Sequence, residues 1–301
     1  MFYEELYLFY LQPIPLGVFS LMTIGTSCLS LFFHLKRASK SGRFGTLSVL
    51  LVSYTLSSLL NYLVCVNAYV FSKFQQFLPN GTFYINVEYI VLSLQFDILS
   101  ELAKHIGGIM VSVSSSFLAL DRVLVMALPA HYKLCKVGMK LAIASCLLSY
   151  SPVVAFGAPP FVEADREVYE FFVNYGFVAQ RYVLLSSLAI ETFLHVVFVI
   201  QYRSFMKRQS SYSEDVSTIN HIVLFQVFSN VIFCFIPYIV YCLQWHFSDN
   251  REVTWIVQAV RKFNDYRTVL YSFATLLSSS FTLYKLLSLS RKNRVVAVSH
   301  M

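Results

Sequence analysis

The sequence predicts an all-α integral membrane protein, a seven-transmembrane helix bundle. Three observations predict this fold: few charged residues, seven apolar stretches of membrane length, and basic residues that gather in alternate connections. Only 13% of the 301 residues are charged and 57% are hydrophobic, whereas a soluble domain carries about 25% charged residues. The mean hydropathy is +0.61. A chain so poor in charge cannot cover a water-soluble surface, so we expect it to lie in lipid.

Apolar stretches long enough to cross a bilayer occur at seven places. The third has charged residues in its outer part and the seventh is rich in serine, so these two are the least clean. The chain has no repeat and no long linker, so residues 1–301 should form a single transmembrane domain. The expected spans are 14–33, 46–71, 95–127, 141–160, 182–202, 221–245 and 268–289.

Basic residues indicate the orientation of these spans. The connections after the first, third, fifth and seventh spans, with the adjoining span ends, hold 15 basic and three acidic residues. The loops on the other side hold seven basic and ten acidic residues. The basic side of a membrane protein faces the cytoplasm, so we expect the N-terminus outside and the C-terminus inside. The sequon Asn80-Gly81-Thr82 then falls in an outer loop, which makes Asn80 the expected glycosylation site.

The charge and the cysteines exclude several other classes. The net charge of +7 does not indicate a nucleic-acid partner, because the charges lie in short stretches between apolar runs. The six cysteines show no CxxC spacing and the seven histidines no His-x-x-x-His, so we expect no metal site and no cofactor. Without a Gly-x-Ser-x-Gly or comparable motif, we do not expect an enzyme. The lipid bilayer is the first partner that the composition implies.

The third span has charged residues near both ends and an apolar centre. Lys104 and Arg122 are 18 residues apart, which is about five helical turns and about 27 Å of rise. They should therefore lie on one face of one helix, near opposite edges of a hydrocarbon layer about 30 Å thick. Such a helix can connect events outside the membrane to events inside.

Asp121 and Arg122 stand side by side at the inner end of this span, and Pro129 and Tyr132 follow at the start of a basic loop. A lone arginine here would be read as an anchor that reaches the interface. With the acid beside it, the segment resembles the Asp-Arg-Tyr motif of rhodopsin-like G-protein-coupled receptors, with Val123 in place of the tyrosine. The resemblance implies a switch in which Asp121 restrains Arg122 until the bundle opens.

Spans six and seven carry two weaker resemblances to the same superfamily. Cys234-Phe235-Ile236-Pro237 is similar to its Cys-Trp-Leu-Pro motif, with Phe235 for the tryptophan. Pro237 should kink the sixth helix, so that Phe235 and Pro237 form a lever whose inner end can swing; a merely tolerated membrane proline is the alternative. In span seven only Tyr284 remains of the family's Asn-Pro-x-x-Tyr motif.

The departures from the superfamily pattern separate this chain from the amine, peptide and opsin branches. Asp97 stands where the third span usually has its disulfide cysteine, span two has no aspartate, and Ala274 replaces the retinal lysine. The aromatic-rich spans, the DRVLVMALPAHYK segment and the short tail look most like a nematode serpentine chemoreceptor of class XA or BC. That resemblance implies a plasma-membrane receptor of a sensory cilium or dendrite. It would bind an odorant- or pheromone-like small molecule and activate a heterotrimeric G protein.

Ionisable residues in the outer half of the bundle are the candidate ligand pocket. Glu101, Lys104 and His105 lie within one and a half turns, and Glu191 and His195 are four apart in span five. Ionisable groups at membrane depth are costly and favour a functional interpretation, although Glu101 and Lys104 could simply neutralise each other. The receptor resemblance places Lys104 at the ligand cavity, where a lysine would favour an acidic or carbonyl-bearing ligand over an amine.

Small residues occupy the middle of the third span. We expect them to let neighbouring helices approach closely, a packing role favoured over ligand contact. They are Gly107, Gly108, Ser112, Ser114, Ser115 and Ser116.

A membrane transporter or channel is the alternative function. Transport would predict paired broken helices or a charged pathway deep in the bundle. Apart from Glu191, the charges lie near the membrane edges, and no internal repeat is visible. The sequence therefore favours the receptor.

The orientation gives the first testable prediction. With the N-terminus outside, Asn80 carries a glycan, so glycosidase treatment of the expressed protein should shift or sharpen its gel band. Asn80→Gln should abolish that shift. Unchanged mobility of Asn80→Gln, together with labelling of a C-terminal tag on intact cells, would show that the orientation is wrong.

Overall fold

The computed structural model describes residues 13–41, 45–76, 87–157, 177–208, 214–237, 239–240 and 267–299. Every regular element in these ranges is a helix, so the all-α prediction is confirmed for this part of the chain. The α-helices are α2 (Pro13–Ser41), α3 (Thr46–Gln76), α4 (Val87–Ala127), α5 (Pro129–Leu134), α6 (Val137–Gly157), α8 (Phe177–Arg208), α9 (Glu214–Asn230) and α12 (Arg267–Ser299). A π-helix, η3 (Val231–Phe235), continues directly from α9.

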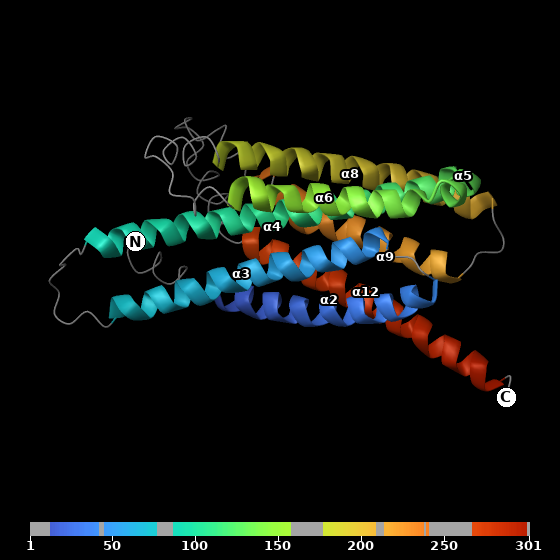
Figure 1. The fold of residues 1–301 in the computed structure, drawn as a ribbon, viewed down its shortest axis with the longest axis horizontal. Coiled ribbons are helices and arrows are strands. Elements are labelled where there is room, and N and C mark those ends of the chain that lie inside the picture. The colour runs from blue at the N-terminus through green and yellow to red at the C-terminus, as the bar shows by residue number, and fades with distance from the viewer. Residues whose placement is uncertain are drawn as a thin grey trace.

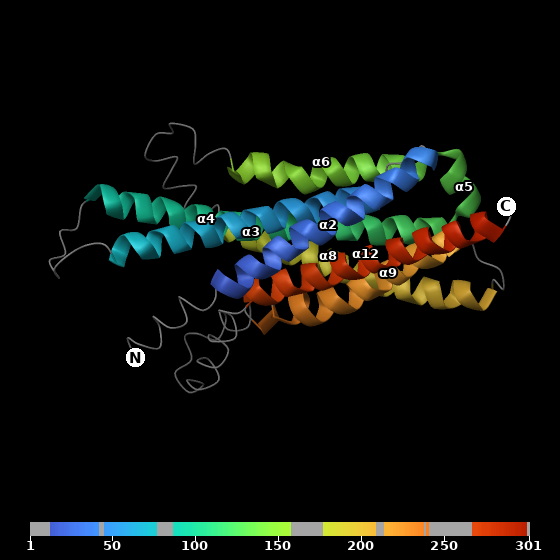
Figure 2. The same cartoon turned by 90° about the horizontal axis from the view of Figure 1, so that it is seen from below.

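The long helices lie side by side and run alternately in opposite directions (Figure 1). Helix α2 packs between α3 and α12, α3 packs on α4, α4 on α8, and α8 on α9, which returns to α12 and closes the ring. Helix α6 packs outside the ring against α3 and α4 (Figure 2). The short α5 lies at the end of the bundle where α4 finishes and α6 begins. Sequence reasoning placed this end in the cytoplasm.

Four of the described helices are long and apolar enough to cross a membrane. A shorter apolar helical stretch covers Asn220–Phe235. Together they identify a helical, multi-pass membrane protein. The four segments are Ile14–Lys36, Thr46–Val66, His105–Ala127 and Tyr182–Phe205, and they correspond to the first, second, third and fifth expected spans.

The helices are longer than the apolar stretches on which their prediction rested. Helix α4 begins at Val87 and not near residue 95, and it ends at Ala127 as expected. Helix α2 continues to Ser41, beyond the apolar run that ends at residue 33. At the end of α2 the helical hydrogen bonding continues through Lys36, Arg37 and Lys40, and long basic side chains can reach water from such positions. Apolar length alone therefore underestimates helix length. The continuous α4 carries both Lys104 and Arg122 on one helix, as predicted.

Large apolar side chains lie on the outside of the bundle and small polar ones on the inside, as expected for helices surrounded by lipid. On α2, Leu21, Leu29 and Phe32 are exposed, whereas Ser20 and Ser27 are fully buried. Exposed apolar residues on α6 and α8 follow the same pattern. The buried core still contains large residues where α3, α4, α8 and α9 meet, among them Leu50, Leu51, Tyr54, Leu118, Phe198 and Val223.

The small residues of α4 let its neighbours approach closely, as the sequence predicted. A Cβ added to Gly107 would lie 2.6 Å from Oγ of Ser57 on α3, and one added to Gly108 would lie 3.2 Å from Leu184 on α8. The hydroxyl of Ser114 forms hydrogen bonds with Ser53 on α3 (2.7 Å) and with Ser149 on α6 (2.8 Å). Hydroxyls on α4 therefore join helices as well as making room for them.

A candidate switch at the inner end of α4

Asp121 and Arg122 form an ion pair in the last two turns of α4. The Asp121 side chain is buried, with 3% of its surface exposed. Nε of Arg122 donates a hydrogen bond to Oδ2 of Asp121 at 3.0 Å, and the terminal Nη2 contacts the same oxygen. Only 13% of the Arg122 side chain is exposed, so the arginine lies against the bundle and does not extend into solvent.

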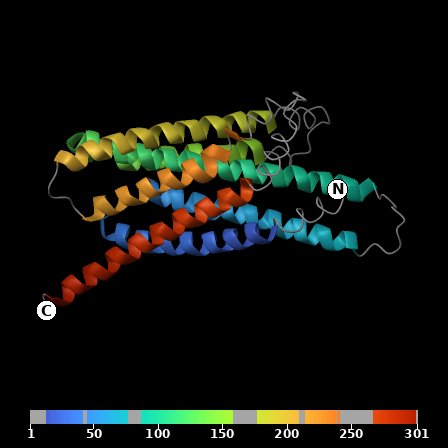
Figure 3. The same ribbon diagram turned by 180° about the vertical axis from the view of Figure 1, so that it is seen from behind.

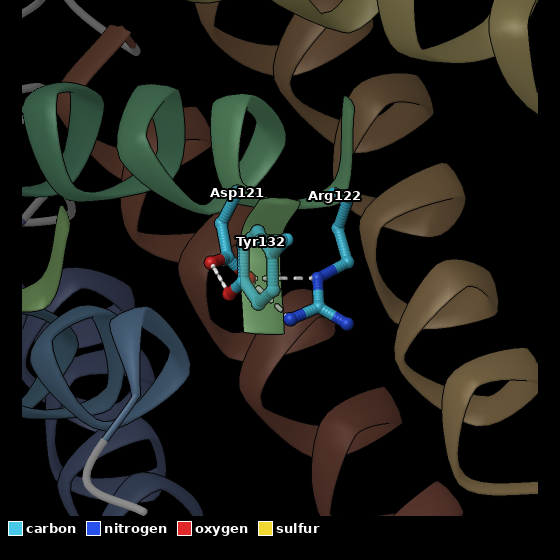
Figure 4. Close-up of polar contacts among 3 residues, drawn as sticks. All are labelled: Asp121, Arg122 and Tyr132. Carbon is cyan, nitrogen blue, oxygen red and sulfur yellow. Dashed lines mark hydrogen bonds and ion pairs between the residues drawn. The ribbon is translucent and has the colours of Figure 1, made fainter. Parts of the chain in front are cut away.

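Tyr132 comes from the short helix that follows and completes the contact. Helix α4 ends at Ala127, and Pro129 begins α5, a position that suits proline because the first helical N–H needs no partner. One turn later, the hydroxyl of Tyr132 donates a hydrogen bond to Oδ1 of Asp121. Figure 4 shows the carboxylate of Asp121 between the Tyr132 hydroxyl and the Arg122 guanidinium. Each carboxylate oxygen thus has its own donor.

Gly138 on α6 leaves the space in which the Tyr132 hydroxyl lies. A Cβ at this position would overlap the hydroxyl oxygen of Tyr132, and it would lie 3.5 Å from Oδ1 of Asp121. An alanine would therefore push the hydroxyl away from the carboxylate. The first turn of α6 is thus a third element that determines the contact.

We refer to Asp121, Arg122 and Tyr132 as the inner contact, after the cytoplasmic side on which the sequence predicts this end of the bundle. Hydrogen bonds to charged groups each contribute about 1.5–3 kcal/mol. Burial keeps the ion pair from the solvent screening that weakens exposed pairs. While both oxygens of Asp121 are engaged in this way, the guanidinium of Arg122 is held against its own helix.

The other two predicted parts of the inner mechanism lie elsewhere in the bundle. Tyr284 on α12 is 64% exposed, and its described aromatic contact is with Phe281 on its own helix, at a centroid distance of 6.5 Å. Pro237 is buried and Phe235 half-buried in the sixth span. Tyr284 is therefore not part of the inner contact.

The sixth span is interrupted just before its proline. Residues Val231–Phe235 form a π-helix, and the N–H of Ile236 bonds back to the carbonyl of Val231, five residues earlier. Pro237 has no N–H to donate, and its ring would crowd the carbonyl four residues before it. A π-helical turn widens the helix locally and is a recognised cause of bends. The sequence predicted a kink and a lever at Phe235 and Pro237, and that stays a prediction. The π-helical turn before Pro237 was not foreseen from the sequence.

The predicted pocket residues divide into described and undescribed ones. His105, Glu191 and His195 are all buried. Glu101 and Lys104 lie on α4, but their side chains are outside the described part, as is Asn80 altogether. The pocket prediction therefore stays a prediction.

Glu191 is bound to two residues that sequence reasoning did not assign to a site. Ser112 Oγ on α4 donates a hydrogen bond to Oε2 of Glu191 at 2.7 Å, and Asn230 Nδ2, the last residue of α9, donates to Oε1. His195, one turn further along α8, is 1% exposed, and its ring nitrogens have no hydrogen-bond partner among the described residues. A buried carboxyl demands donors, but the sequence does not say which of many Ser and Asn residues supply them.

Among the described residues, no group of three or more His, Cys, Asp or Glu side chains could hold a metal ion. No family model matches the chain, and a search of curated proteins finds no significant relative. The class that the described structure defines is a helical multi-pass membrane protein. The particular activity has to be argued from the inner contact and the residues around it.

The geometry around Gly138 gives a second prediction. Tyr132→Phe removes one hydrogen bond to a buried carboxylate, which should lower the free energy of unfolding by about 1–3 kcal/mol. Gly138→Ala should have a similar effect, because it displaces the same hydroxyl. The two changes together should cost little more than either alone, since both remove one interaction. Thermal unfolding of the detergent-solubilised chain measures all three variants.

Gly25→Ala is the matched control, because a Cβ at Gly25 on α2 meets no atom within 4 Å. It should be at least as stable as the parent, because alanine favours a helix over glycine by up to about 1 kcal/mol. Full additivity of Tyr132→Phe and Gly138→Ala, or a Gly138→Ala variant as stable as Gly25→Ala, would contradict the packing described.

Proposed function

We propose that this chain is a seven-transmembrane, G-protein-coupled chemosensory receptor of the plasma membrane. Its N-terminus would face outside, where a small molecule binds in the outer half of the bundle. Its basic inner face would activate a heterotrimeric G protein. The proposal includes no enzymatic step and no cofactor.

The observation that carries this proposal is the inner contact. A largely covered arginine at the expected inner end of a long membrane helix is held by the acid beside it in sequence, which also accepts a hydrogen bond from a tyrosine hydroxyl of the next connection. An anchoring arginine would extend to the interface, whereas the Arg122 side chain is largely covered. A charged group kept covered next to a basic connection is available for release. This arrangement supports a switch better than an anchor.

The switch would act through the donors of Arg122. When the inner ends of the helices separate, the guanidinium leaves Asp121 and becomes accessible from the cytoplasm. The C-terminus of an α-helix carries a partial negative charge and unbonded carbonyl groups. A partner that inserts such a helix end into the opened bundle would accept hydrogen bonds from the planar guanidinium. Basic residues of the inner loops would attract an acidic partner to the same face.

The ligand and the lever complete the proposed pathway. Lys104, with Glu101, His105, Glu191 and His195, would receive a ligand bearing a negative or strongly accepting group. Its binding would act on the sixth helix at the π-helical turn before Pro237. A helix already interrupted there can change direction at a smaller cost than a regular one.

The second candidate function is a transporter or channel, and Glu191 is the observation that favours it. A carboxyl at mid-membrane depth is a common part of proton and ion pathways. Here, however, both of its oxygens accept hydrogen bonds from Ser112 and Asn230. That arrangement favours a link between helices over a site on a pathway, so we rank transport below reception.

The third prediction concerns coupling. Arg122→Ala should abolish ligand-dependent G-protein activation and leave ligand binding intact, because the residue lies at the inner end. Asp121→Asn weakens the restraint on the arginine by removing its counter-charge, so basal activation should rise by about tenfold, the change expected when about 1.4 kcal/mol is lost from the closed state. The measurement is G-protein activation in cells, normalised to the receptor at the surface.

Arg122→Lys is the control that separates the two roles of the arginine. A lysine reaches the membrane interface equally well, so an anchoring role predicts a nearly silent change. A docking role through a planar fork of donors predicts loss of signalling. Full signalling by Arg122→Ala would overturn the receptor mechanism and favour the transporter.

A further inference from the structure

A second buried carboxyl group, that of Glu191, forms hydrogen bonds between helices in the described bundle. Glu191 is 2% exposed, and its carboxyl group joins three helices: α8, which carries it, α4 through Ser112, and α9 through Asn230. Among the described side chains, no Lys or Arg forms an ion pair with it. A buried carboxyl depends on such donors, because none of the water that would otherwise solvate it is present in lipid.

The Glu191 contact lies directly before the π-helical turn of the sixth span. Ser112 lies nine residues before Asp121 on α4, about 13 Å from the inner contact. On α9 the carboxyl group accepts a hydrogen bond from Asn230, the residue directly before the π-helical turn Val231–Phe235. The link therefore fixes α9 at the point where the sixth span stops being a regular α-helix.

The other contacts of α9 lie mainly on a different neighbour. Phe225 stacks on Phe281 of α12 at a centroid distance of 4.3 Å, and Ser229 Oγ donates to the carbonyl of Ala274 on α12 at 3.4 Å. Figure 3 shows the orange α9 beside the red α12. Towards α8, an edge-on contact of Tyr202 with the His221 ring lies below Glu191, at a centroid distance of 6.4 Å. The hydrogen bonds at Glu191 attach α9 to α8 and α4 at one defined geometry.

We propose that Glu191 is a latch that holds α9 against α4 and α8, and that α9 can turn at η3 only after Asn230 leaves the carboxyl group. The latch itself follows from the contacts; its part in signalling rests on the proposed receptor function. The sequence assigned Glu191 to a ligand pocket. The latch gives this residue of the fifth span a different role, that of joining helices. Glu191 is on this account a positioning residue for the sixth helix.

The chemistry of the latch distinguishes two substitutions. Glu191→Gln keeps an oxygen that accepts from Asn230 and adds an N–H₂ group that can donate to the Ser112 hydroxyl, so it should keep the helices joined. Glu191→Leu removes both hydrogen bonds and places an apolar side chain of similar volume in lipid-like surroundings. Because Ser112 and Asn230 then lose their acceptor, this change should also lower the free energy of unfolding. Exchange in α2, which packs on α3 and α12, separates loosening of α9 from general unfolding.

Hydrogen–deuterium exchange of the full chain in lipid nanodiscs, without ligand or G protein, tests the latch. In Glu191→Leu, the amides of α9 and η3 should exchange about three- to tenfold faster, and those of α2 should be unchanged. Glu191→Gln should lie within about twofold of the parent over the same segments. Basal G-protein activation, measured in parallel, should rise for the leucine variant alone.

Substitutions on α9, which carries the donor Asn230, supply a second test if Glu191→Leu does not fold. Asn230→Ala should loosen α9 and η3 as Glu191→Leu does. Ser229→Ala, which removes the neighbouring contact to α12, is the control and should not loosen the attachment of α9 to α8. Parent-like exchange in Asn230→Ala, or equal loosening by Glu191→Gln and Glu191→Leu, would overturn the latch. Faster exchange without G-protein activation by any variant would support the latch and count against the receptor function.

Discussion

A carboxyl group buried in a membrane bundle must find its hydrogen-bond donors within the protein, because lipid offers none. This constraint determines the two polar contacts on which the proposed mechanism depends. Asp121 is satisfied by Arg122 and Tyr132 near the inner edge, and Glu191 by Ser112 and Asn230 near the middle. Each contact joins elements that are separate in the chain. Breaking either one exposes a polar group that must then be satisfied elsewhere, which is a requirement for a switch with two discrete states.

The packing of the bundle makes these contacts possible. Gly107 and Gly108 bring α3 and α8 close to α4, and Gly138 makes room for the Tyr132 hydroxyl. Helices in lipid gain little from the hydrophobic effect between them, so close approach and hydrogen bonds must supply the association. The same residues that allow packing therefore also set the distances at which carboxyl groups meet their donors. Helix α4 takes part in both polar contacts, which makes it the link between the middle and the inner end.

Much of this arrangement could be predicted from the sequence. Apolar runs and the distribution of basic residues indicate membrane helices, because lipid penalises charge in any fold. Asp121 and Arg122 are indicated as a functional pair by their resemblance to a family motif. Neighbouring side chains on a helix point in different directions, so the ion pair itself is known only from the structure. The sequence placed Tyr132 in the same site because it follows the third span. The structure shows that its hydroxyl donates directly to the Asp121 carboxylate.

The rest depends on distances that a sequence does not contain. The partners of Glu191 lie 79 and 39 residues away in the chain, so only the packing of three helices selects Ser112 and Asn230 from many similar residues. Gly138 reads as an ordinary glycine until the position of the Tyr132 ring is known. The proline at 237 predicted a kink, but not that the turn before it, Val231–Phe235, would be π-helical. Tyr284 matched a motif by sequence, yet its exposed side chain takes no part in the inner contact.

The most direct measurement of the central claim is a structure of the chain bound to a nucleotide-free heterotrimeric G protein, determined by electron cryomicroscopy. The account predicts that the guanidinium of Arg122 has left Asp121 and lies within hydrogen-bond distance of the C-terminal helix of the G-protein α-subunit. It also predicts that Asn230 has separated from Glu191. A docked G protein with the Arg122–Asp121 pair and the Glu191–Asn230 contact both intact would contradict the account.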